Sequence, residues 1–139
     1  MYVLHLDHLV LTVKSIEDTC RFYETVLGMT RETFGQGRMA LKFGHQKINL
    51  HEVGKEFEPK ALRATPGSAD LCFIVSDLGQ AERSIRQAGV EILAGPVQRT
   101  GASGPITSLY LRDLDGNLLE VSEPVSLMEQ NEGATNQIS

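Results

Sequence analysis

The chain has 139 residues, with 41% hydrophobic and 22% charged residues, which is typical of a globular protein large enough for a sizeable core. Its formal net charge is −5 and its basic residues are not clustered, so the sequence argues against a nucleic-acid partner. The apolar runs are short, so we expect no signal peptide or membrane span, and a cytoplasmic location. Cys20 and Cys72 lie in separate apolar stretches, and we expect both thiols to be buried and reduced.

Alternating apolar residues predict the first strand at His8–Val13, whose odd-numbered residues share one face while His8 lies on the other. Ser15 is a typical helix N-cap and Gly28 a typical helix end, so the segment between them is predicted to be a helix. Three further strands are predicted at Thr30–Phe34, Arg38–Phe43 and Lys47–Val53.

The same order of elements then recurs. A strand is predicted at Asp70–Val75, followed by a helix that Asp77 begins and Gly89 ends. Short strands are predicted at Glu91–Ala94, Ser108–Arg112 and Leu118–Ser122. The caps Ser15 and Asp77 hold equivalent positions, so the chain is predicted to be an α+β protein made of two tandem βαβββ modules.

We expect one domain over residues 1–124, made of module one (4–53), a linker (54–68) and module two (69–124), and a flexible tail at 125–139. Module two is longer than module one, and the extra length is placed in Gln98–Pro105. This glycine-rich segment is expected to be a long mobile loop, which would be either a lid or a tolerated insertion.

Three stretches carry a resemblance to a known group of proteins: Leu6–Leu11, Phe22–Met29 and Arg112–Val121. Together with the tandem modules they resemble the vicinal oxygen chelate superfamily. That superfamily includes glyoxalase I, methylmalonyl-CoA epimerase, extradiol dioxygenases, fosfomycin-resistance enzymes and bleomycin-binding proteins. The third stretch is similar to the superfamily's closing Asp-Pro-Asp-Gly-Asn…Glu signature, with Leu114 in place of the proline.

A closer resemblance, to the glyoxalase domain-containing protein 5 group, is carried by Asn49–Lys60 and Arg99–Pro105. The resemblance implies that the modules form a curled, half-open mixed sheet with helices on its outer face. It also implies a homodimer, in which a site is built either within one chain or from module one of one chain and module two of the other.

The resemblance implies a divalent-metal site on the first and last strands of each module. Those positions hold His8, Asp70, Glu120 and, in module one, Asn49 or His51. Strand parity agrees, because His8, Glu120 and His51 are each out of phase with their apolar neighbours. A gap-free match favours Asn49, but we choose His51 because imidazole is the stronger ligand. Imidazole and carboxylate together suit Zn, Ni, Co, Mn or Fe.

Each predicted ligand has an ordinary alternative. His8 would be a core histidine that bonds a backbone carbonyl, Glu120 a solvated strand residue, and His51 a surface residue at a strand end. Asp70 stands where glyoxalase I and the extradiol dioxygenases usually carry histidine. It is therefore a fourth ligand, a general base or an exposed residue after the linker.

The candidate substrate contacts are Arg38, Arg99, Tyr110 and Arg112. Tyr110 and Arg112 share one face of a predicted strand, and an arginine there favours an anionic substrate through paired hydrogen bonds. The alternative for each arginine is a solvated surface position.

These features lead us to expect a metal-dependent glyoxalase-like enzyme that acts on a small oxygen-chelating substrate. The resemblance implies isomerase or lyase chemistry through a metal-stabilised enediolate, with Glu120 and Asp70 as catalytic residues. Two alternatives stay open: an Fe(II) extradiol-type ring-cleavage dioxygenase, and a metal-free binding module of the bleomycin-resistance kind. A binding module does not need His8 and Glu120 in register, and this favours the enzyme.

Overall fold

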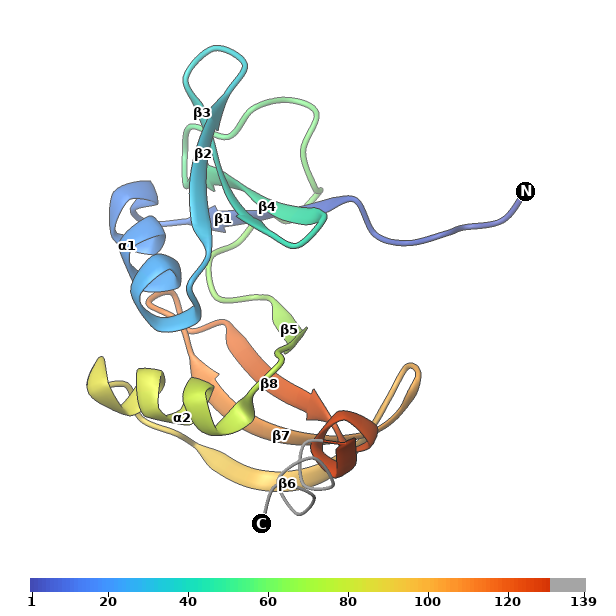
Figure 1. The fold of residues 1–139 in the computed structure, drawn as a ribbon. Coiled ribbons are helices and arrows are strands. Elements are labelled where there is room, and N and C mark those ends of the chain that lie inside the picture. Colours follow the sequence, from blue (N-terminus) through green and yellow to red (C-terminus); the bar gives the residue numbers. More distant parts are fainter. Residues whose placement is uncertain (131–139) are drawn as a thin grey trace. The chain divides into compact units, whose positions relative to one another are not determined.

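The computed structural model describes residues 1–130, and the described part forms two units, each with one four-stranded sheet (Figure 1). Unit 1 comprises residues 1–69 and 113–117, and unit 2 comprises residues 70–112 with the chain from 118 onward. Each unit contains one βαβββ module, which confirms the predicted tandem α+β organisation. No helix within residues 1–130 is long and apolar enough to cross a membrane.

The elements of unit 1 are β1 (His8–Val13), α1 (Ile16–Leu27), β2 (Thr30–Phe34), β3 (Arg38–Phe43) and β4 (Gln46–Glu52). The strand order is β1-β4-β3-β2, with β1 parallel to β4 and the other pairs antiparallel. Helix α1 begins where the Ser15 side chain accepts a hydrogen bond from the Asp18 backbone N–H at 3.1 Å. It ends at Gly28, whose φ of 67° is left-handed and suits glycine.

The sheet of unit 1 has two chemically different faces. Pairing sets Val10 of β1 opposite Asn49 of β4, and Thr12 opposite His51. His8 therefore shares a face with Asn49 and His51, as the sequence predicted. The other face carries the buried Leu41, Ile48 and Leu50, and α1 lies beside β2, β3 and β4 to form the core of the unit.

The elements of unit 2 are β5 (Asp70–Ile74), α2 (Leu78–Gln87), β6 (Ala94–Gly101), β7 (Gly104–Arg112) and β8 (Leu118–Pro124). The strand order is β5-β8-β7-β6, which repeats the order of unit 1. Asp77 caps α2 by accepting from the Gln80 backbone N–H at 3.1 Å, as predicted. In the predicted tail, residues 125–130 are helical and residues 131–139 lie outside the described part.

Two expectations about unit 2 are wrong. The strand expected at Glu91–Ala94 is instead β6, which starts at Ala94 and runs to Gly101. The expected long loop at Gln98–Pro105 is the tip of a hairpin, because Arg99 pairs with Ile106 and Gly101 with Gly104. The extra length of module two therefore lies mostly in paired strands. The β-branched and turn residues of the segment Gln98–Pro105 are compatible with a hairpin. The prediction of short strands joined by a loop did not include this hairpin.

The cysteine expectation is half confirmed. Cys20 is buried in α1, whereas Cys72 is exposed on β5. Strand β5 is an edge strand of its sheet and α2 covers the other face, so apolar neighbours in sequence do not bury this thiol.

Candidate functional site

His8 begins β1 on the polar face of unit 1. Its side chain is 44% exposed, and its Nδ1 lies 2.8 Å from a carboxylate oxygen of Asp7. A ring nitrogen bonded to a carboxylate leaves the other nitrogen, Nε2, available to a ligand. The bond from His8 also lowers the pKa of the Asp7 carboxyl.

His51 lies on the same face but in a different environment. It is buried, with 3% of its surface exposed, and its Nε2 lies 3.2 Å from Nη2 of Arg38. A guanidinium can only donate, so this ring nitrogen accepts and His51 is neutral. Burial is the main cause that lowers the pKa of His51, and the charge of Arg38 lowers it further.

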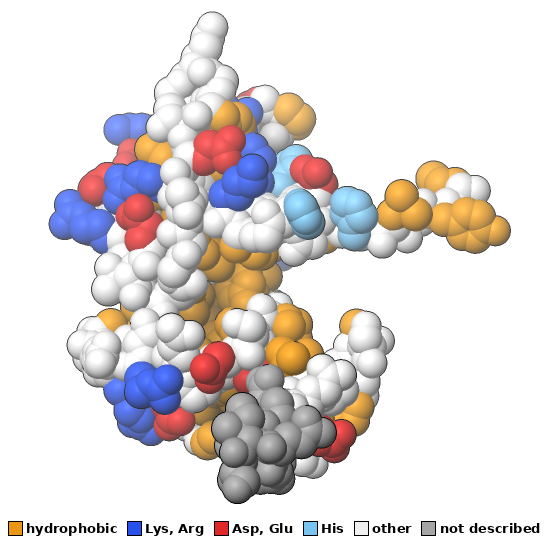
Figure 2. Space-filling view, viewed as in Figure 1, with side chains coloured by type: hydrophobic (Ala, Val, Ile, Leu, Met, Phe, Trp, Pro, Cys, Tyr) orange, Lys and Arg blue, Asp and Glu red, His pale blue; other side chains and the backbone are white. Residues whose placement is uncertain are grey.

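Arg38 belongs to a stack of cations and aromatic rings that the sequence did not predict. Its Cζ lies 5.2 Å from the ring centre of Phe34 and 4.6 Å from that of Phe57. The Nζ of Lys47 lies 3.6 Å from the centre of the Phe34 ring. In Figure 2, basic side chains and histidines lie near one another on unit 1. The alternation in β2, β3 and β4 could have indicated a shared face, but Phe57 comes from the linker and had no such signal.

Asn49 lies between Lys47 and His51 on β4, and it is 6% exposed. Its Oδ1 is buried without a hydrogen-bond partner in the part of the chain that the structure describes. A buried acceptor without a partner is destabilising, and this makes Asn49 a candidate to bind a donor or a cation.

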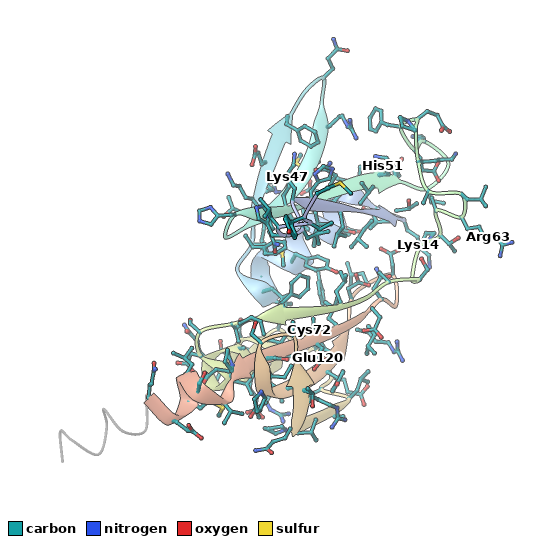
Figure 3. All side chains as sticks on the ribbon, turned by 90° about the vertical axis from the view of Figure 1, so that its right-hand side faces the viewer. Lys14, Lys47, His51, Arg63, Cys72 and Glu120 are labelled. Atoms are coloured by element: carbon teal, nitrogen blue, oxygen red, sulfur yellow. The ribbon has the colours of Figure 1, made fainter. Side chains whose placement is uncertain are left out.

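In unit 2, Glu120 lies on β8 within a network of hydroxyl groups. The Ser108 hydroxyl donates to its Oε2 at 2.6 Å, and the hydroxyls of Ser108 and Ser122 lie 2.7 Å apart. Cys72 Sγ lies 3.3 Å from the Ser122 hydroxyl, and Figure 3 shows Cys72 and Glu120 on neighbouring strands. Burial raises the pKa of the Cys72 thiol, and the Glu120 charge raises it further. Ser108 was not predicted, although it lies on the same strand face as Tyr110.

The other predicted residues of unit 2 also gather on the Glu120 face. Tyr110 is opposite Glu120 in the pairing of β7 and β8, and its hydroxyl accepts a 3.1 Å hydrogen bond from Arg99. Asp70 is exposed at the start of β5, two residues before the position opposite Glu120. Arg112 ends β7 and is exposed.

The predicted residues thus divide between the units. His8, His51 and Arg38 lie in unit 1, whereas Asp70, Glu120, Arg99, Tyr110 and Arg112 lie in unit 2. Residues 1–130 include no group of three His, Cys, Asp or Glu side chains that could hold a metal ion.

Unit 1 also contains a cavity of about 560 Å³ beneath the linker. Its lining combines apolar residues such as Val10, Pro59 and Ala61 with polar and charged residues that include His51, Lys60 and Arg63. Gly67 of the linker lies close to the turn at residues 113–117, since a Cβ at this position would lie 2.5 Å from the backbone oxygen of Asp115. A cavity of this size is in the range that holds small organic ligands.

The comparisons with known proteins agree with the fold. Residues 5–121 match the family described as the Glyoxalase/Bleomycin resistance protein/Dioxygenase superfamily. The chain is 59% identical over 126 residues to the virulence protein STM3117 of Salmonella typhimurium, which covers 90% of this chain and 88% of that protein. It is 55% identical over 121 residues to the glyoxalase domain-containing protein RDO1 of Mycosarcoma maydis, which covers 86% of this chain and 68% of that protein.

Among solved structures, the integron cassette protein VCH_CASS1 of V. cholerae superposes with a TM-score of 0.87 at 60% identity, over 88% of this chain and 97% of that one. These matches confirm the resemblance inferred from the sequence, and the chain belongs to the Glyoxalase/Bleomycin resistance protein/Dioxygenase superfamily.

Proposed function

We propose that this protein is a metal-dependent, glyoxalase-like enzyme that carries out isomerase or lyase chemistry on a small substrate with two adjacent oxygens. The observation that carries the proposal is the setting of Glu120. Ser108 donates a hydrogen bond to one carboxylate oxygen of Glu120, Oε2, at 2.6 Å. Partners of this kind orient a carboxylate that binds a metal.

The donors suit a divalent cation. Asp7 holds the His8 ring through Nδ1, so Nε2 is the nitrogen that would bind the metal. His8 and Glu120 together offer a nitrogen and an oxygen, which suit borderline to hard ions. When bound, such an ion polarises substrate oxygens as a Lewis acid.

Strand β4 would supply a third donor. Arg38 occupies the Nε2 of His51, and a guanidinium beside a divalent cation is repulsive. The orphaned Oδ1 of Asn49 is free of this conflict. His51 as a metal ligand stays a prediction, and we favour Asn49 for the β4 position.

Asp70 is proposed as the fourth ligand or as the general base. It lies on the Glu120 face of unit 2 and is exposed, so a substrate can reach its carboxylate. Arg99 and Tyr110 on the same face are proposed to contact the substrate, since their mutual hydrogen bond orients the guanidinium.

We also propose a homodimer in the cytoplasm. Strands β1 and β5 each lie at the edge of their own sheet, and edge strands are open to pairing. The donors of one metal would then come from one chain or from two. Analytical ultracentrifugation would test the dimer, and a monomer at micromolar concentration would contradict it.

The test of the enzyme proposal is the metal content of the purified protein by elemental mass spectrometry. We expect near-stoichiometric metal in the wild type and in Glu82→Gln, a matched control on α2 that forms a salt bridge with Arg86. We expect the metal to be lost in Glu120→Gln. Equal metal in both variants would refute the site.

The same measurement bears on the two alternatives. Iron as the bound metal would direct assays to catechol ring cleavage. If no candidate ion binds, the cavity beneath the linker favours the metal-free binding module.

A further inference from the structure

We propose that Arg38 anchors an oxyanion site on unit 1, which binds a carboxylate or phosphate group of a ligand through the guanidinium edge. The site consists of Arg38, Lys47, His51, Phe34 and Phe57. It includes none of His8, Asn49, Asp70 and Glu120, the metal donors favoured above, and it gives His51 a role other than metal binding. Calling the ligand a substrate rests on the proposed function, but the binding of an oxyanion does not.

Two aromatic rings and one histidine lie against the guanidinium. Phe34 and Phe57 lie at 5.2 Å and 4.6 Å from Cζ, and Nη2 points to His51 at 3.2 Å. An arginine flanked by rings in this way has few rotamers left, so less entropy is lost when it binds. One of its five N–H donors is used by His51, and the rest remain for a planar oxyanion.

The cations of this site form no salt bridge with a described carboxylate, although the charge of Lys47 helps to lower the pKa of the Asp7 carboxyl. Within residues 1–130, neither Arg38 nor Lys47 forms a salt bridge with a carboxylate. Arg31, one strand away, shows the contrast, because it pairs with both Glu17 and Glu24 at 2.8 Å. Two partly buried cations without a salt-bridge partner are the complement of an anionic group.

His51 acts here as a positioning residue. Its Nε2 accepts from Arg38, because a guanidinium can only donate, and the ring is buried at 3% exposure. The T-shaped contact with Phe57, at 5.4 Å between ring centres, fixes the ring further. This role explains why a buried histidine lies against an arginine, which a metal role does not.

Lys47 adds the second charge. Its Nζ lies 3.6 Å from the centre of the Phe34 ring, on the strand face that also carries Arg38. Figure 3 shows Lys47 and His51 spaced along β4. The acidic group that acts electrostatically on His51 is Glu56, and its own carboxylate is engaged by backbone N–H groups of Gly54 and Glu56. The Glu56 carboxylate forms no salt bridge with Arg38 within residues 1–130.

The test is isothermal titration calorimetry of the full chain with benzoate, with phenyl phosphate, and with benzamide as the neutral counterpart of benzoate. Three proteins are compared: wild type, Arg38→Gln, and Arg21→Gln as a control with the same change in charge on an exposed helix position. Thermal unfolding and metal content are measured on each. The Glu120→Gln variant is titrated as well, so that loss of the metal and loss of the oxyanion site are separated.

We expect at least one oxyanion to bind the wild type and Arg21→Gln about tenfold or more tightly than it binds Arg38→Gln. Benzamide should bind weakly to all of them, and Glu120→Gln should keep its oxyanion affinity. The tighter of the two probes identifies the group as a carboxylate or a phosphate. Equal affinity for benzoate and benzamide in the wild type, or unchanged oxyanion affinity in Arg38→Gln, would overturn the proposal.

Discussion

The hydroxyl of Tyr23 on α1 donates to Oδ2 of Asp113 at 2.6 Å, although 90 residues separate them in sequence. Tyr23 is fully buried, and burial is the main cause that raises the pKa of its hydroxyl above the ordinary value. Asp113 also accepts from the backbone N–H groups of Asp115 and Asn117. This bond fastens the turn at residues 113–117 to unit 1.

Removing this hydroxyl should destabilise the fold. We expect Tyr23→Phe to lower the free energy of unfolding by about 1–3 kcal/mol, because a buried carboxylate loses a donor. Tyr110→Phe is the matched control, since that hydroxyl is bonded to an exposed arginine. Urea unfolding measures both. Equal unfolding free energies for the two variants would show that the bond contributes nothing.

The linker should tolerate a side chain at one glycine and not at another. Gly54 and Gly67 both have a left-handed φ, of 84° and 80°, but only at Gly67 would a Cβ meet the backbone oxygen of Asp115. We therefore expect Gly67→Ala to lower the free energy of unfolding by roughly 1–3 kcal/mol more than Gly54→Ala. A difference near zero between their urea midpoints would mean that the linker moves away freely.

His51 should make stability depend on pH in the acid range. Its folded pKa is lower than the ordinary 6.5, so the unfolded chain binds the proton at higher pH. Its contribution is therefore complete above 6.5 and is lost as the pH falls through the folded pKa. Arg38, Glu56 and Lys60 act on this group as well as burial.

NMR titration of the imidazole measures this pKa. In Arg38→Gln it should rise but stay below the ordinary value, because burial is the larger cause. The free energy of unfolding in urea should fall more between pH 7.5 and pH 5 for the wild type than for His51→Gln. A wild-type imidazole that titrates at or above the ordinary value would contradict the buried, arginine-bonded setting.

Ser108 should tune the metal through Glu120. We expect Ser108→Ala to weaken metal affinity by about 10–100-fold, because the carboxylate loses the 2.6 Å bond that orients it. Ser103→Ala, in the hairpin turn between β6 and β7, is the control and should bind metal as the wild type does. Competition with a chelator measures both affinities, and a normal value for Ser108→Ala would argue against Glu120 as a ligand.

Much of the fold could be predicted because the helix-capping residues and the periodicity of apolar residues indicated the same elements. Ser15, Gly28 and Asp77 marked helix ends by backbone chemistry that the structure shows directly. Strand parity placed His8 and His51 on one face, since pairing has a strict period of two.

The errors arose where pairing partners decide structure. The hairpin tip at Gly101–Gly104 is held by cross-strand pairing, whereas its glycine content favoured the prediction of a mobile loop. Likewise, the contact of Arg38 with Phe57 joins a strand to an irregular segment, and hydrophobic periodicity cannot predict such a contact. The role of His51 as a metal ligand stays a prediction, and the structure adds that its Nε2 lies 3.2 Å from the Arg38 guanidinium.

The most direct test of the central claim is a crystal structure of the cobalt-loaded protein, with anomalous data collected at the cobalt absorption edge. We predict one strong peak at about 2.0–2.2 Å from His8 Nε2 and from a Glu120 carboxylate oxygen, within one chain or between two copies, with Arg38 still bonded to His51. A peak bound elsewhere, or bound to His51 with Arg38 displaced, would contradict the account.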